Sequence, residues 1–193
     1  MKPTKKVVAK SVVAAGFTAA IVTATVPFLT KWEGTDLVAK PDMIGTGHPL
    51  TYCHGATAVD GSVRSGEKFT PAQCDALLAK SLPKYLHPLQ ACIKEAVPVK
   101  IMAAALDASY NAGPLAVCRS AIVSKINAGD LTGACNAFKG WYIRASGRVV
   151  KGLINRRVDE KKLCLEGVAE GLPKTPITPW WQHAAKTLLF WRA

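Results

Sequence analysis

The first thirty residues constrain this chain most. Residues 1–10 carry four lysines and no acidic residue, and residues 11–30 contain no charged side chain. A basic start followed by twenty uncharged residues is typical of an export signal or a membrane span. Twenty residues of helix cover about 30 Å, the thickness of a bilayer's hydrocarbon core. We therefore predict that residues 1–30 form a signal anchor. The alternatives are a cleaved signal peptide, although no clear A-x-A site precedes Lys31, and a buried helix of a soluble protein.

The apolarity of this segment is marginal for a permanent anchor. Eight of residues 11–30 are Val, Ile, Leu or Phe, and the others are Ala, Thr, Ser, Gly and Pro. Each strongly apolar residue favours insertion by roughly 0.5 kcal/mol, whereas the others contribute little or oppose it. Such a segment could enter the membrane and later leave it. Because Glu33 lies three residues beyond Thr30, it would sit at the lipid headgroups during insertion, and we hypothesise that the anchored form is inactive.

Beyond residue 30 the chain has the composition of one folded domain followed by a tail. Of its 193 residues, 49% are hydrophobic, which is enough for a core. The formal net charge of +12 at pH 7 predicts attraction to a polyanion, such as nucleic acid, anionic lipid or the acidic polymers of a bacterial envelope. A nucleic-acid partner is disfavoured because the start directs export and no recognition motif is present. We place the domain at residues 31–168 and a linker with a tail at residues 169–193.

Six cysteines are spread through the chain, and no two of them form a C-x-x-C pair. This pattern lacks the usual zinc and thioredoxin-type spacings, and it suits disulfides in an oxidising compartment. Buried free thiols in a cytosolic protein are the alternative. His87 and His183 are isolated histidines, so we expect no metal site at either of them.

Secondary-structure signals after residue 42 change from weak alternation to helical periodicity. The first part predicts a small β-hairpin or three-stranded sheet around residues 43–65, with Asp60-Gly61 as a turn. Thr70-Pro71-Ala72-Gln73 has the pattern of a capping box with Thr70 as N-cap. The charged run R-R-V-D-E-K-K is expected to be solvated surface, although Arg156 and Arg157 could touch a substrate. Helices are predicted at residues 70–83, 85–96, 99–111, 117–128, 131–140 and 149–168.

The C-terminal segment combines prolines with aromatic residues. Three prolines lie between residues 172 and 179 and predict a linker. The sequence W-W-Q-H-A-A-K-T-L-L-F-W-R-A follows. This tail could form a short amphipathic helix on a membrane or on cell-wall material, or it could fold back onto the domain.

Two acidic residues at the start of the domain have the types that glycosidic bond hydrolysis needs. Glu33 follows Trp32, and Asp42 lies nine residues later, before a Gly-rich loop. A carboxylic acid held near apolar Trp32 and Leu37 could keep its proton and act as general acid, while a carboxylate in a wetter loop stays ionised. Two acidic residues at this spacing are common in proteins, and they can simply be solvated residues of a helix end and a loop. The pair alone therefore assigns no function.

A set of longer motifs runs in order along residues 31–166. These motifs are W-E-G at 32–34, Asp42, L-T-Y-C-H-G at 50–55, F-T-P-A-Q-C-D-A-L-L at 69–78, S-Y-N-A-G at 109–113, C-R-S at 118–120, K-I-N-A-G-D-L-T-G-A-C at 125–135 and G-L-I-N-R-R at 152–157. In type and order they resemble the phage-type lysozymes of glycoside hydrolase family 24. Within that family they are most similar to lambdoid-phage endolysins that carry an N-terminal signal-arrest-release segment.

The resemblance implies an α+β, lysozyme-like fold with a small antiparallel sheet lobe and a mainly helical lobe. It also implies a catalytic set of Glu33, Asp42 and Thr51, with no cofactor and no metal. Glu33 would protonate the leaving oxygen of the β-1,4 bond between N-acetylmuramic acid and N-acetylglucosamine, and Asp42 with Thr51 would hold the attacking water. The loop before Thr51 is longer than the family pattern, which leaves Thr46 as an alternative. Ala56 replaces a histidine that often follows the glycine of this motif.

The resemblance has further implications for cross-links and location. The expected place of action is the periplasmic face of the host inner membrane and, after release, the periplasm, where a monomer would cut peptidoglycan. The family's helical layout implies the disulfide pairs Cys53–Cys74, Cys92–Cys118 and Cys135–Cys164.

Two other functions compete with a hydrolytic muramidase. A non-catalytic cationic protein could disrupt anionic membranes with its basic domain and Trp-rich tail. A lytic transglycosylase would use the same acid on the same bond but leave an anhydro sugar.

Overall fold

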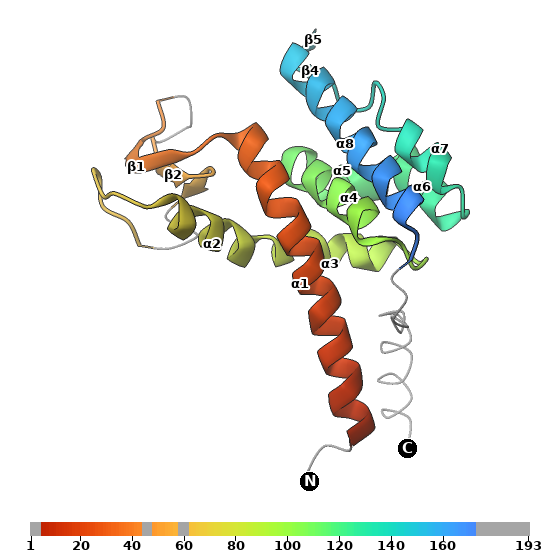
Figure 1. Ribbon diagram of the computed structural model, residues 1–193. Coiled ribbons are helices and arrows are strands. Elements are labelled where there is room, and N and C mark those ends of the chain that lie inside the picture. The colour runs from red at the N-terminus through yellow and green to blue at the C-terminus, as the bar shows by residue number, and fades with distance from the viewer. Residues whose placement is uncertain (1–4, 44–47, 58–61, 173–193) are drawn as a thin grey trace, which may run out of the picture.

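The computed structural model describes residues 5–43, 48–57 and 62–172, with side chains described from Gly16 onward. The chain forms a small sheet lobe and a larger helical lobe (Figure 1). The long helix α1 (Lys5–Glu33) ends where the lobes meet, and its N-terminal turns extend beyond the other described elements (Figure 1). The predicted division into a small antiparallel sheet and a mainly helical part is confirmed.

Helix α4 (Val99–Ala112) is the centre of the helical lobe. It consists mainly of small apolar residues, and residues 101–109 are all buried. The helix ends at Ala112 and is followed by Gly113, whose φ of 86° places it in the left-handed region, and then by Pro114. Helices α1 and α8 (Lys151–Glu170) pack against α4. The helix predicted at residues 99–111 is therefore confirmed as the core of the domain.

The C-terminal half of α1 contributes one face to this core. Ile21, Thr25 and Leu29 are buried, and their spacing of four residues places them on the same side of the helix. The Thr25 hydroxyl donates to the Ile21 carbonyl at 2.7 Å, so its burial leaves no donor unsatisfied. Thr23 and Pro27 are exposed. Part of the segment predicted as an anchor thus packs inside the folded domain. Across the described ranges, the structure contains no helix with both the length and the apolarity needed to cross a bilayer.

The sheet lobe contains one antiparallel sheet with the strand order β1-β2-β3. The sheet was predicted around residues 43–65, but its first strand lies before residue 43. The last two strands are joined through His54-Gly55. Cys53 and Gly55, at φ 55° and 82°, supply the left-handed backbone of this tight connection. The predicted turn at Asp60-Gly61 lies outside the described residues. The strands are β1 (Asp36–Pro41), β2 (Leu50–Cys53) and β3 (Ala56–Thr57).

The remaining helices follow the predicted order, with one division. The capping box predicted at Thr70 is confirmed, because its Oγ1 accepts from the Gln73 amide while the Gln73 side chain accepts from the Thr70 amide. The helix predicted at residues 117–128 is two helices, because Ser120 is extended and its hydroxyl donates to the Val117 carbonyl. These helices are α2 (Pro71–Ser81), α3 (Pro83–Cys92), α5 (Pro114–Cys118), α6 (Ala121–Asn127) and α7 (Leu131–Asn136).

A short hairpin that the sequence did not predict precedes α8. Strands β4 (Arg144–Ala145) and β5 (Arg148–Val149) pair across Ser146 and Gly147, which have φ values of 48° and 76°. Two successive left-handed residues are typical of a tight hairpin turn. Strands of two residues are too short to produce an alternating pattern, which is why sequence reasoning missed them.

Helix α8 corrects the prediction of a solvated charged face. Arg156, Arg157 and Glu160 are buried, whereas Lys162 is exposed. The buried charges lie on the side of α8 that faces α4. The helices approach closely there, because a Cβ atom added to Gly167 would lie 2.9 Å from a backbone nitrogen of α4.

Three disulfides join neighbouring elements of the domain. They connect β2 to α2, α3 to α5, and α7 to α8, and each typically adds about 2 to 4 kcal/mol of stability. All three pairings implied by the resemblance are confirmed, namely Cys53–Cys74, Cys92–Cys118 and Cys135–Cys164.

We expect Gly167→Ala to destabilise the protein by about 1 to 3 kcal/mol, because the added methyl group meets the backbone nitrogen of Ile101 as well as side-chain atoms of Ile101 and Lys100. Gly152→Ala is the matched control. A Cβ atom at Gly152 meets nothing within 4 Å, so alanine there should be neutral or slightly stabilising. Urea denaturation of the oxidised proteins measures both changes, and equal stability of the two variants would contradict the close approach of α4 and α8.

Candidate active site

Glu33 is the last residue of α1 and ends at the junction of the two lobes. Its Oε1 lies 2.6 Å from Nη1 of Arg156, and 26% of the Glu33 side chain is exposed, so solvent and ligands can reach the carboxylate. Trp32 and Leu37 were expected to surround this group. The structure adds a guanidinium as its direct partner, and 38% of the Leu37 surface is exposed. The charged neighbour of Glu33 is therefore Arg156, which the sequence near Glu33 did not predict.

Arg156 is held rigidly by a second carboxylate. Its Nε and Nη2 each donate to Asp107 on α4 at 2.9 Å, which forms a bidentate pair. Burial alone would lower the pKa of Arg156, but the hydrogen bonds and charge of Asp107, together with the charge of Glu33, outweigh that effect and raise the pKa. Arg156 is therefore a permanent cation that connects α8, α4 and the end of α1.

A second layer of buried charge lies behind this pair. Arg157 Nη2 is 2.7 Å from Glu160 Oε1 and donates to Asn111 Oδ1 at 3.0 Å, and the guanidinium carbon lies 5.1 Å from the centre of the Trp141 ring. Burial lowers the pKa of Arg157, against the attraction of Glu160. Burial also raises the pKa of Glu160 well above its usual value, and the nearby Asp107 carboxylate raises it further. Burial and Asp107 therefore favour the protonated form of Glu160, whereas the charges of Arg157 and Arg156 favour the carboxylate.

We predict that Glu160→Gln changes how stability depends on pH. A pKa raised in the folded state means that the folded protein binds more protons, so the free energy of unfolding falls as pH rises from the unfolded-state value, about 4.3, toward the folded one. The variant lacks this loss. Its stability relative to wild type should therefore increase between about pH 4 and pH 7, by at most about 1.4 kcal/mol per pH unit. Urea denaturation across this range tests the prediction, and a difference that does not vary with pH would contradict it.

Asp42 and Thr51 lie on neighbouring parts of the sheet. Asp42 directly follows β1, and its amide donates to the Pro49 carbonyl at 2.8 Å. Thr51 lies in β2 opposite Lys40, and its hydroxyl is 3.5 Å from the Lys40 carbonyl oxygen. Lys40 is exposed whereas the adjacent Ala39 is buried, as expected where side chains alternate along a strand, and Asp42 lies one residue beyond the end of β1. The structure thus places Asp42 and Thr51 at neighbouring positions of the β1–β2 pair, while Thr46 lies outside the described residues.

An irregularity in β1 shortens the path from Glu33 to Asp42. Asp36 pairs with Cys53 and Lys40 pairs with Thr51, so four steps along β1 correspond to two steps along β2. Two steps of regular strand cover about 7 Å, against about 13 Å for four. Bulges of this kind are frequent near active sites, where they redirect side chains. Here the bulge keeps the residues that follow β1 closer to the end of α1 than a regular strand would.

His54 is a buried histidine that sequence reasoning did not assign. Only 2% of its surface is exposed. Its Nδ1 donates to the Gly34 carbonyl at 2.7 Å, and its Nε2 lies 3.2 Å from Asp75 Oδ1. The Tyr110 hydroxyl donates to the His54 carbonyl at 2.8 Å. The C-H-G motif indicated this position, but not its contact with the residue after Glu33.

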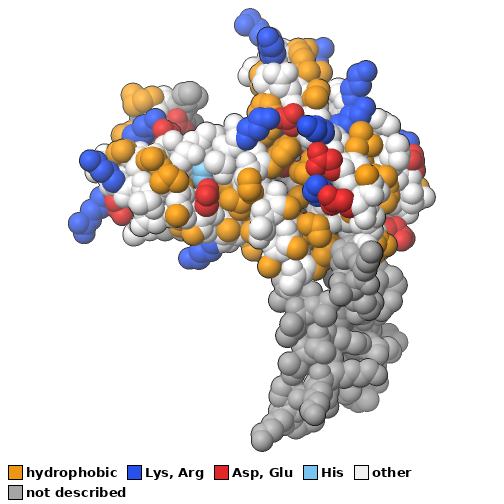
Figure 2. Space-filling model, viewed as in Figure 1, with side chains coloured by type: hydrophobic (Ala, Val, Ile, Leu, Met, Phe, Trp, Pro, Cys, Tyr) orange, Lys and Arg blue, Asp and Glu red, His pale blue; other side chains and the backbone are white. Residues whose placement is uncertain are grey.

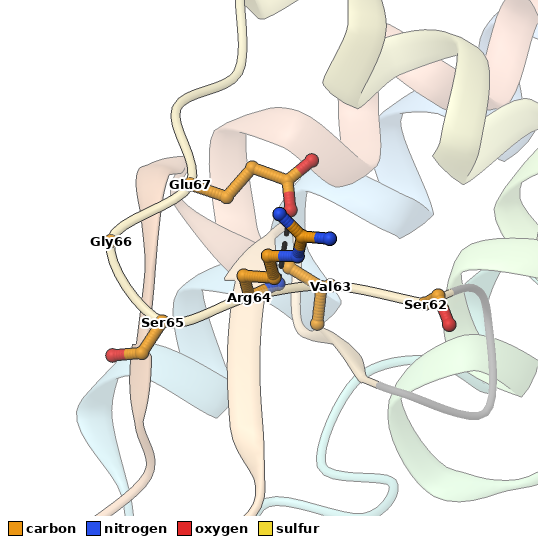
Figure 3. Close-up of a pocket in the computed structure, with 6 residues that line it drawn as sticks. All are labelled: Ser62, Val63, Arg64, Ser65, Gly66 and Glu67. Carbon is orange, nitrogen blue, oxygen red and sulfur yellow. Dashed lines mark hydrogen bonds between the residues drawn. The ribbon is translucent and has the colours of Figure 1, made fainter.

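A shallow hollow beside the sheet is built from a single loop. It is lined by residues 62–67, and the Arg64 amide donates to Glu67 Oε2 at 3.0 Å (Figure 3). The same loop pairs with the outer edge of β1, since the Ala39 amide donates to the Glu67 carbonyl and the Gly66 amide donates to the Ala39 carbonyl. The loop therefore covers an exposed strand edge. Across the ranges the structure describes, no group of three or more potential ligands could hold a metal ion.

Comparison with known proteins identifies the class. A family model described as phage lysozyme matches residues 30–160. The SAR-endolysin of Enterobacteria phage P21 is 35% identical over 135 residues, which cover 70% of this chain and 78% of that protein. The solved endolysin of Escherichia coli O157:H7 phage FAHEc1 aligns with a TM-score of 0.64 at 26% identity, covering 78% of this chain and 94% of that one. A P22 lysozyme mutant shares the fold, with a TM-score of 0.65 at 24% identity over 73% and 94% of the two chains.

The chain belongs to the phage lysozyme family. Within that family it is an endolysin, a muramidase that hydrolyses peptidoglycan in host-cell lysis. The lysozyme-like fold expected from the sequence motifs is confirmed by these structural neighbours.

Proposed function

We propose that Glu33 is the general acid of this muramidase and that Asp42 and Thr51 hold the water that attacks the sugar. The observation that carries this proposal is the position of Glu33, which lies partly exposed at the lobe junction and is held by Arg156. The neighbouring positions of Asp42, directly after β1, and Thr51, in β2, also support it.

In the proposed reaction, Glu33 protonates the oxygen of the β-1,4 bond between N-acetylmuramic acid and N-acetylglucosamine as the bond breaks. Asp42 accepts a proton from the water, and the Thr51 hydroxyl orients that water on the opposite face of the ring. This route inverts the anomeric centre and requires the two carboxyl groups to lie about 6.5 to 9.5 Å apart. A peptidoglycan strand, with its stem peptides, carries acidic groups. Lys and Arg side chains project from the β4–β5 hairpin and from the sheet lobe (Figure 2). These cations would favour the encounter of the enzyme with peptidoglycan.

We predict that Glu33→Gln lowers kcat on purified peptidoglycan by at least about 100-fold, because the variant keeps the shape of the side chain but cannot donate a proton. The turbidity of a murein suspension measures the rate. Glu95→Gln, on the exposed connection between α3 and α4, is the matched control and should retain activity. Normal murein cleavage by Glu33→Gln would exclude Glu33 as the acid, and host lysis that persists without cleavage would favour membrane disruption.

The products and the threonines test the rest of the proposal. Mass analysis of the released muropeptides should find hydrated muramic acid ends, whereas 1,6-anhydro ends would identify a transglycosylase. Thr51→Ala should lower kcat and Thr46→Ala should not. The reverse result would transfer the water-holding role to Thr46.

We further propose that residues 11–30 first hold the enzyme in the inner membrane and that it acts in the periplasm, as a monomer, after their release. The packing of α1 supports this proposal. Ile21, Thr25 and Leu29 lie in the protein core, so the same residues cannot be in the lipid when the domain is complete. Glu33 is the last residue of α1, whereas its partner Arg156 lies on α8 in the helical lobe. Membrane insertion would therefore separate the proposed acid from its site.

We predict that leucines at exposed positions of α1 delay lysis without damaging the enzyme. Ala19→Leu, Ala20→Leu and Thr23→Leu together leave the buried face unchanged, but each strengthens insertion by roughly 0.5 kcal/mol. More protein should fractionate with the inner membrane, and host lysis should occur later. Serine at the same positions is the control. The purified, released triple-leucine enzyme should cleave murein like wild type, and lysis at the normal time would contradict the proposed anchoring.

A further inference from the structure

We propose that His54 is a positioning residue that sets the location of Glu33 relative to the sheet. The inference rests on the proposed role of Glu33 as the acid. His54 itself does not contact substrate, because its side chain is almost completely buried. It acts through the backbone of the residue that follows Glu33.

The first step of the argument is the contact at the end of α1. Gly34 has a φ of 72°, so the chain turns sharply after Glu33, and its carbonyl can no longer join the helical hydrogen bonds. His54 Nδ1 donates to this carbonyl at 2.7 Å, and the Thr35 hydroxyl lies 3.4 Å from the same nitrogen. The imidazole thus replaces the missing helical donor and determines where the backbone leaves α1.

The second step is the anchoring of the ring itself. His54 Nε2 faces Asp75 on α2, and the Thr30 hydroxyl of α1 is 3.5 Å from the same carboxylate oxygen. Tyr110 of α4 donates to the His54 carbonyl. The adjacent Cys53 is cross-linked to Cys74 of α2. The ring therefore has little freedom to rotate, and contacts from the residue after α1, from α2 and from α4 meet at His54.

The third step connects this residue to the reaction. Thr51 lies three residues before His54, at the other end of the same strand segment, and β2 pairs with β1, which leads to Asp42. The bond from His54 to Gly34 consequently links the segment that carries the acid to the segment that would hold water. Arg156 fixes the carboxylate head of Glu33 from the opposite lobe. A displacement of about 1 Å between catalytic groups can cost on the order of 100-fold in rate, so such a link has a measurable effect.

The test uses two amides that each replace one ring nitrogen. In His54→Asn the amide nitrogen can occupy the place of Nδ1 and still donate to the Gly34 carbonyl. In His54→Gln it reaches the place of Nε2 and contacts Asp75 instead. Both variants are assayed as the full, oxidised chain in its released form. We expect His54→Gln to lower kcat by about tenfold or more with KM unchanged, and His54→Asn to stay within about threefold of wild type.

A purely structural histidine would give a different result. Both variants would then lose stability, and kcat per folded molecule would be the same for the two, which would overturn the proposal. Thermal melting provides the folded fraction for this comparison. If neither amide variant folds, Asp75→Asn weakens the Nε2 anchor and the long contact with Thr30 but keeps the bond from His54 to Gly34, and it should lower kcat severalfold at constant KM. An unchanged kcat there would also overturn the proposal.

Glu33→Gln separates this inference from the proposed function. If that variant is inactive while His54→Gln behaves like wild type, only the positioning role fails. If Glu33→Gln is active, the proposed role of Glu33 as general acid is wrong. Where residual activity of Glu33→Gln can be measured, adding His54→Gln should not lower it further, because the histidine acts through Glu33.

Discussion

The ion pair between Arg156 and Asp107 is the interaction on which the site depends. Both partners are buried, and two parallel hydrogen bonds join them across the contact between α8 and α4. Because removing one partner of such a pair leaves an unpaired charge in the core, neither residue can change alone without a large loss of stability. The pair also leaves one guanidinium nitrogen for Glu33. The core of the helical lobe thereby determines the electrostatics at the end of α1.

Local signals in the sequence predicted much of the fold. The capping box at Thr70 and the apolar helix around α4 depend on residues within a few positions of one another, so a linear pattern contains them. The buried charges of α8 do not have this property. In sequence, Arg156 and Glu160 look like a solvated helix face, and only the partner Asp107, 49 residues before Arg156, shows that they are inside. The two-residue strands beside Ser146 were missed because they have no period to detect.

The candidate site divides in the same way. Glu33, Asp42 and Thr51 were predicted from motifs, and the structure places Glu33 at the lobe junction, Asp42 directly after β1 and Thr51 in the neighbouring strand β2. The residues that hold Glu33 were not predicted. Arg156 was expected at the surface, and His54 was part of a motif whose contacts are long-range. Sequence therefore indicated the chemistry, whereas the supporting contacts required the tertiary structure.

The placement of the disulfides has a consequence for assembly. The three cross-links join β2 to α2, α3 to α5, and α7 to α8, and α1 contains no cysteine. Every covalent constraint thus lies in the part of the chain that follows α1. Oxidation can restrict that part to few conformations before the first helix arrives, which lowers the entropy lost at the final step. In the proposed release from the membrane, the docking of α1 would therefore complete the enzyme, and no disulfide would hold α1 in place.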